Sequence, residues 1–164
     1  MTRTVLFSFF MVSSSLLGCE KATAPGGPIG SASTSGTVSV ETSLGAFVIE
    51  TDASAAPDTV ANFLAYVDAG FYDGGDGLGE TTFHRVIANF MVQGGGYKTN
   101  GNLKPPRDRI DHEGDNGLLN LRGTVAMART SEPDSATCQF FVSVVDNASL
   151  DYVSEASPGY VVFG

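Results

Sequence analysis

Tryptophan is absent from this 164-residue chain, and cysteine and positively charged residues are scarce. Only nine Lys and Arg residues stand against eighteen Asp and Glu residues, which gives a formal net charge of −9. Binding to a phosphate backbone depends on clustered Lys and Arg, so we expect no nucleic-acid partner. The hydrophobic content of 42% is nevertheless typical of a globular protein.

Long hydrophobic runs are also missing. The apolar segment from Val5 to Leu17 follows Arg3 and is broken by serines, and it is shorter than the roughly twenty residues that span a bilayer. A positive residue before a short apolar run is typical of an export signal. We therefore predict that residues 1–18 are a signal peptide.

The end of this segment predicts a lipid anchor. Leu16-Leu17-Gly18-Cys19 resembles the lipobox of bacterial lipoproteins, in which the cysteine thiol is acylated; the alternative is an ordinary signal peptide with an incidental cysteine. Residues 19–36 hold almost no bulky apolar side chains, and we interpret them as the lipidated Cys19 followed by a flexible linker. These features predict an exported cell-envelope lipoprotein, periplasmic or associated with the outer membrane, which contacts the membrane through Cys19.

Acylation of Cys19 would leave Cys138 without an intramolecular disulfide partner. Cys138 lies in the apolar run Thr137-Cys138-Gln139-Phe140-Phe141-Val142, where a cysteine usually serves as a small buried hydrophobe. We expect that structural role rather than nucleophilic chemistry.

The remaining residues, 37–164, predict one domain that is mainly β. Alternating apolar residues between Val38 and Ile49, interrupted by a Ser43-Leu44-Gly45 turn, predict a β-hairpin. Pro57 precedes apolar residues with helical spacing, and Gly70 supplies a stop, so we expect one helix between them. Short apolar runs then favour a barrel or sandwich; they cover residues 83–86, 90–93, 123–128, 140–145 and 160–163.

Several of these runs resemble the motifs of cyclophilins. Residues 83–87 (FHRVI) and 90–97 (FMVQGGGY) are similar to the family signature, and residues 121–130 (LRGTVAMART) with 135–141 (SATCQFF) are similar to its second block. Residues 115–118 (DNGL) and 159–164 (GYVVFG) follow in the family's order. The resemblance covers nearly all of residues 37–164.

The resemblance implies a fold and its limits. It implies an eight-stranded antiparallel β-barrel with capping helices. The family's second helix and last strand would follow Gly164, so we expect the domain, residues 37–164, to be incomplete at its C-terminus.

The resemblance also implies an activity, peptidyl-prolyl cis-trans isomerisation that assists the folding of exported proteins, with proline-containing polypeptides as partners and neither cofactor nor metal. Arg85 corresponds to the family's catalytic arginine. A planar guanidinium that stays charged suits an electrostatic role. The matching substrate-binding positions are Phe90, Met91, Gln93, Ala128, Arg129, Gln139, Phe141, Leu150 and Tyr160. Ser149 stands where many members carry an indole.

Two other functions remain open at this point. The first is a proline-recognising or chaperone-like module with little catalysis, because an incomplete barrel would support the site poorly. The second is a hydrolase using Ser135 with a histidine, although the sequence around Ser135 lacks a nucleophile-elbow motif. The glycine-rich residues 73–80 faintly suggest calcium, but their carboxylates lack EF-hand spacing, and we favour a solvated loop.

Overall fold

The computed structural model describes residues 2–7 and 35–164, which form two β-sheets and one α-helix. One sheet has the order β1 (Thr2–Phe7), β2 (Thr37–Thr42), β3 (Gly45–Glu50). The other has the order β4 (Asp73–Gly74), β5 (Gly79–Ile87), β6 (Met91–Lys98), β8 (Phe140–Ser143), β7 (Val125–Met127). The helix is α1 (Pro57–Asp68), and η1 (Pro133–Ser135) and η2 (Ala148–Leu150) are short 3₁₀ turns. The predicted mainly β class, hairpin and helix are confirmed.

Strand pairing is antiparallel except where β1 runs parallel to β2. Arg3 in β1 also forms an ion pair with Asp68 at the end of α1, with Nε 2.9 Å from Oδ1. Strand β1 lies within residues 1–18, which the sequence predicts to be an export signal. That assignment stays a prediction. Cys19 and most of the linker lie outside the described residues. Within residues 2–7 and 35–164, no helix is long and apolar enough to cross a bilayer.

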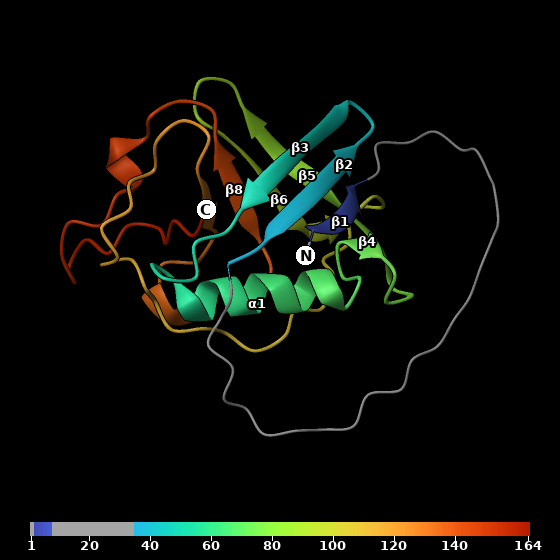
Figure 1. Cartoon of the computed structure of the whole chain (residues 1–164), viewed down its shortest axis with the longest axis horizontal. Helices are drawn as coiled ribbons and strands as arrows, with labels where there is room; N and C mark the ends of the chain where they lie inside the picture. The colour runs from blue at the N-terminus through green and yellow to red at the C-terminus, as the bar shows by residue number, and fades with distance from the viewer. Residues whose placement is uncertain (1, 8–34) are drawn as a thin grey trace.

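The helix α1 packs across one end of the curled sheets, as Figure 1 shows. Its predicted apolar face, Val60, Phe63, Leu64 and Val67, is buried. The Phe63 ring is the centre of an aromatic cluster, with ring centroids 5.1 Å from Phe163 and 5.5 Å from Phe140. Buried aromatic rings contribute large apolar areas and favourable edge contacts. The helix therefore holds β8 and the C-terminal run together.

The C-terminal run of residues 160–163 does not form an assigned strand of its own. It pairs with β7 through an isolated bridge between Ala126 and Val162. Backbone bonds from Val125 N to Gly164 O (2.9 Å) and from Met127 N to Val161 O (3.0 Å) extend this pairing. The run thus continues the second sheet beyond β7.

The curled sheets leave an apolar hollow of about 340 Å³ near the turn of the β2–β3 hairpin, away from α1. The hollow is lined almost entirely by apolar side chains, namely Leu44, Phe47, Phe83, Val86, Val92, Val142 and Val144, with Thr42. Phe47 and Phe83, from the two sheets, meet there with ring centroids 6.2 Å apart. The two sheets therefore contact one another through aromatic rings while one end stays open.

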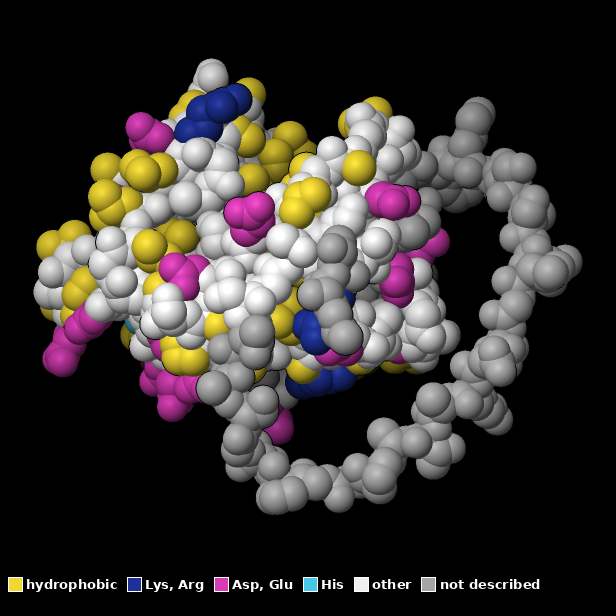
Figure 2. Space-filling model, viewed as in Figure 1, with side chains coloured by type: hydrophobic (Ala, Val, Ile, Leu, Met, Phe, Trp, Pro, Cys, Tyr) yellow, Lys and Arg dark blue, Asp and Glu magenta, His cyan; other side chains and the backbone are white. Residues whose placement is uncertain are grey.

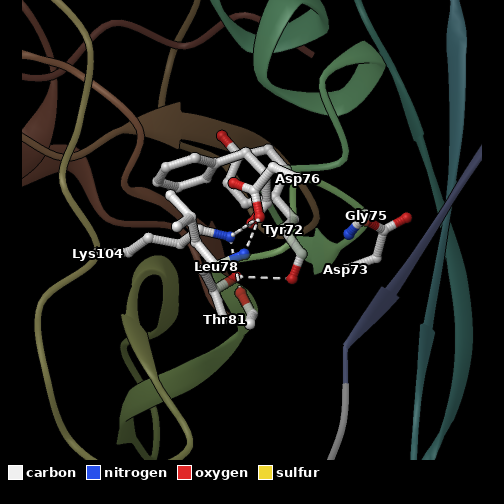
Figure 3. A network of polar contacts seen from close by, with 9 residues as sticks. Tyr72, Asp73, Gly75, Asp76, Leu78, Thr81 and Lys104 are labelled. Carbon is white, nitrogen blue, oxygen red and sulfur yellow. Dashed lines mark hydrogen bonds and ion pairs between the residues drawn. The ribbon is translucent and has the colours of Figure 1, made fainter.

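A buried lysine organises the loop between α1 and β5. The ammonium of Lys104 donates to Phe71 O (2.5 Å), Gly79 O (2.7 Å) and Asp76 Oδ1 (2.8 Å). It also lies 4.5 Å from the centroid of the Phe71 ring, and the Lys104 side chain is fully buried. Figure 3 shows this side chain reaching the loop carboxylate of Asp76. Each of the three ammonium donors therefore has an acceptor.

Residues 73–80 are partly exposed, as at Gly77 and Leu78, and they are anchored by Lys104. The Asp76 carboxylate of this loop faces the ammonium of Lys104 instead of open solvent. Among the residues that the structure describes, no group of three or more His, Cys, Asp or Glu side chains is arranged to hold a metal ion. Lys104, whose side chain closes the loop, lies 28 residues after Asp76 and 25 residues after Gly79.

We expect Lys104→Met to lower the free energy of unfolding by about 3 kcal/mol, because it leaves two carbonyls without their donor and the Asp76 carboxylate without its cation. Urea denaturation followed by circular dichroism measures this change. Lys98→Met is the matched control, since Lys98 is only half-buried and, within the described residues, forms no ion pair. A loss no larger than that of the control would contradict the structural role of Lys104.

Candidate active site

Four of the strands align a row of side chains across the second sheet. Arg85 of β5 lies opposite Gln93 of β6, Gln93 lies opposite Phe141 of β8, and Phe141 lies opposite Ala126 of β7. Directly opposed residues of antiparallel strands project to the same face of the sheet. The register therefore brings the predicted arginine, a predicted amide and a predicted aromatic residue to one face.

Hydrogen bonds orient the polar end of this row. Arg85 Nη1 donates to Gln93 Oε1 (3.2 Å), and Gln93 Nε2 donates to Gln139 Oε1 (3.0 Å). The close approach of Gln139 to β6 requires glycine, because a methyl group on Gly96 would lie 2.5 Å from Cδ of Gln139. Arg85 is otherwise exposed. One donor thus fixes the guanidinium, and its other donors face solvent.

The apolar end of the row forms a second hydrophobic cluster, separate from the core under α1. Its buried members are Met91, Ala126, Phe141 and Val162, and its partly buried members are Phe90, Leu118, Ala128, Leu150 and Tyr160. Met91 and Phe141 are 2% and 4% exposed, so they form the floor. Phe90, Leu150 and Tyr160 are half-buried and present apolar surface beside Arg85's strand. Six of the predicted substrate-binding residues therefore lie in one cluster, namely Phe90, Met91, Ala128, Phe141, Leu150 and Tyr160.

Arg129 and Tyr160 form the far wall of this cluster. The Arg129 guanidinium lies 4.9 Å from the centroid of the Tyr160 ring, and that ring meets Phe141 edge-on at 5.5 Å. Arg129 Nε donates to Gly159 O (2.8 Å), and Nη1 donates to Thr130 O (2.9 Å). Because backbone carbonyls occupy these donors, Arg129 acts here by packing against Tyr160.

Two buried asparagines support the site, and the sequence analysis did not identify them. Asn147 Nδ2 donates to Phe90 O (2.9 Å), and Asn120 Nδ2 donates to Leu150 O (3.0 Å). Asn147 N also donates to Asn120 O (2.8 Å), which joins the two supports. No spacing in the sequence marks either residue: Asn120 lies between Leu119 and Leu121, and Asn147 lies between Asp146 and Ala148.

Three side chains outside this row that could in principle be reactive have structural roles, namely Cys138, Ser135 and His84. Cys138 is buried as predicted, and burial raises the pKa of its thiol. Ser135 Oγ donates to Glu132 O (2.6 Å) and accepts from Thr130 N (2.9 Å), so it closes a turn. Burial lowers the pKa of His84, and its ring packs 4.6 Å from that of Tyr97. These contacts give no support to a Ser135 hydrolase.

The arrangement can bind and polarise an uncharged group, because it sets a permanent cation and two amides beside an apolar floor. Comparisons with known proteins identify the family. Residues 37–164 match the family described as cyclophilin type peptidyl-prolyl cis-trans isomerase/CLD. The chain is 50% identical to peptidyl-prolyl cis-trans isomerase A of Dickeya dadantii over 137 residues, a region that covers 84% of this chain and 68% of that protein. It is 48% identical over 128 residues to peptidyl-prolyl cis-trans isomerase B of Escherichia coli, which covers 77% and 74%.

Solved structures show the same fold. Cyclophilin AquaCyp293 from Hirschia baltica matches with a TM-score of 0.61 at 23% identity, over 74% of this chain and 59% of that one. A cyclophilin type isomerase of Cryptosporidium parvum, determined in the presence of the dipeptide Ala-Pro, matches with a TM-score of 0.56 at 27% identity, over 74% and 72%. From its motifs, its fold and these relatives, the chain belongs to the cyclophilin-type peptidyl-prolyl cis-trans isomerases.

Proposed function

We propose that Arg85 accelerates rotation about Xaa-Pro bonds by an electrostatic, non-covalent mechanism. Rotation of a peptide bond crosses a barrier of about 18–20 kcal/mol because it disrupts amide resonance. In the twisted amide the lone pair of the prolyl nitrogen is localised, and a cation directed at it stabilises this state more than either planar ground state. The exposed guanidinium beside Gln93 carries the proposal, since its remaining donors are free to face such a nitrogen.

The proline ring has a matching surface next to Arg85. In this proposal the ring packs on Phe90, Leu150 and Tyr160, over the floor formed by Met91 and Phe141. Gln93 uses one amide hydrogen for Gln139 and has a second for a substrate carbonyl, because an amide nitrogen carries two donors. A tertiary Xaa-Pro amide lacks an N–H, so an apolar ring and one carbonyl are what a site must hold.

The substrates that we propose are proline-containing segments of exported proteins. The support comes from the predicted signal peptide over residues 1–18 and the predicted acylation of Cys19. An anchored enzyme on a flexible linker would work on chains that emerge into the cell envelope. The excess of acidic side chains, visible over the face in Figure 2, would keep the domain away from anionic lipid headgroups.

For Arg85→Ala, the expected result is a roughly hundred- to thousandfold fall in kcat with a much smaller change in peptide affinity, because the lost interaction acts on the twisted state. Exchange between cis and trans resonances of an Xaa-Pro peptide, followed by NMR, measures this directly. Arg122→Ala, at an exposed arginine on the loop before β7, is the control and should keep wild-type exchange.

The same experiment separates catalysis from recognition. Wild-type protein that binds the peptide but leaves the exchange rate unchanged would instead support the proline-recognising module. The observation that favours this second function is the open apolar hollow near the β2–β3 turn, which leaves one end of the fold uncovered.

Membrane anchoring is tested separately with Cys19→Ser. We expect this variant to move from the membrane fraction to the soluble fraction of bacterial cells, because stable anchoring depends on the acyl chains. Cys138→Ser is the matched control, since Cys138 is buried inside the domain and should not affect fractionation. Equal membrane association of wild type and Cys19→Ser would rule out the lipid anchor.

A further inference from the structure

A second hollow, of about 520 Å³, opens beside the polar end of the active-site row. Gln93 and Gln139 line it and also belong to the hydrogen-bonded row of Arg85. The other lining residues are Thr82, His84, Tyr97, Lys98, Thr99 and Gly101. We call it the Lys98 hollow. A polypeptide whose proline packs on the apolar cluster would carry its flanking side chains within reach of this hollow.

The charge of the Lys98 hollow is unusual for this protein. No carboxylate is among its lining residues, although the chain has a net charge of −9. By contrast, a hollow of about 590 Å³ is lined by four acidic residues, Glu113, Asp115, Asp134 and Glu155. Within the part of the chain that the structure describes, Lys98 forms no ion pair. Its ammonium therefore has no internal anion to neutralise it.

The other polar groups of the hollow suit a ligand that accepts hydrogen bonds. The His84 imidazole packs against the Tyr97 ring, with centroids 4.6 Å apart, and forms part of the lining. Gln139 uses its oxygen to accept from Gln93, which leaves its amide hydrogens available. Carboxylates are acceptors only, and they form stronger hydrogen bonds than neutral groups do.

The walls of the hollow are fixed before any ligand arrives. Lys98 N donates to Asn102 O (2.9 Å), and Gly101 N donates to Lys98 O (2.9 Å). The Lys98 stem passes over Gly79, where an added methyl group would lie 3.6 Å from Cδ. The Gly79 carbonyl in turn accepts from the buried ammonium of Lys104 (2.7 Å). The Lys98 stem therefore lies beside a segment that the buried ammonium of Lys104 holds.

We propose that the Lys98 hollow is a specificity subsite that receives an acidic side chain close to the substrate proline, with Lys98 as the residue that selects the charge. This proposal deepens the isomerase function and rests on it. It predicts that client segments carrying Asp or Glu beside the proline are preferred over segments carrying Lys or Arg.

Peptides with Glu or Lys placed in turn at each of the three positions before and after one proline test the proposal. Affinity is measured by NMR titration and turnover by cis–trans exchange. At a position that reaches the hollow, wild type should prefer Glu to Lys by about three- to fivefold, as exposed ion pairs allow. The preference should fade in 1 M salt, where screening acts within about 3 Å.

Substitution of Lys98 identifies the residue responsible. Lys98→Glu should reverse the preference at the same peptide position, and Lys98→Gln should abolish it without reversal. Arg122→Glu makes the same change of net charge on the loop before β7, and it should keep the wild-type preference for Glu. The proposal is wrong if no position shows a preference that Lys98→Glu reverses, or if Arg122→Glu shifts it equally. Because titration reports binding without turnover, absence of exchange catalysis in wild type counts only against the isomerase function.

Discussion

The buried ammonium of Lys104 is the interaction on which the polar side of this fold depends. The ammonium joins Phe71, in the segment after α1, to Gly79 at the start of β5. The backbone N–H of Lys104 also donates to Gly96 O of β6. A buried cation is tolerated only where acceptors replace its lost hydration, and here two carbonyls and the Asp76 carboxylate do so. Lys104 thereby ties the start of β5 and the middle of β6 to the segment after α1.

Strand register brings the predicted site residues to one face of the second sheet. A shift of one residue in the pairing of β5 with β6 would send Arg85 to the face opposite Gln93, because side chains alternate along a strand. Apolar burial specifies the register, since Met91 and Phe141 must both reach the second cluster. The cation and the apolar floor are therefore placed by the same constraint. A surface arginine that, within residues 2–7 and 35–164, forms no ion pair is thereby held beside a hydrophobic surface.

Charge is distributed unevenly around this site, and the unevenness has consequences for function. The hollow next to Gln93 carries Lys98 and no carboxylate, whereas acidic side chains line the hollow of about 590 Å³. Glu113 is one of these acidic residues, yet both its oxygens accept backbone N–H groups at the start of α1, from Asp58 and Thr59. An acidic residue count thus overstates the charge available to a ligand, since part of it caps a helix.

The sequence by itself determined the family, the hairpin and α1, because these depend on local periodicity and on long contiguous motifs. It could not reveal that Lys104 closes residues 73–80, that Asn120 and Asn147 hold the apolar wall, or that Glu113 caps α1 from about 55 residues away. Nor could the short apolar run of residues 160–163 reveal its partner, β7, with which it pairs through a bridge and flanking backbone hydrogen bonds. Each of these features joins segments distant in the chain, and a polar side chain carries no mark of its partner until packing removes water from both.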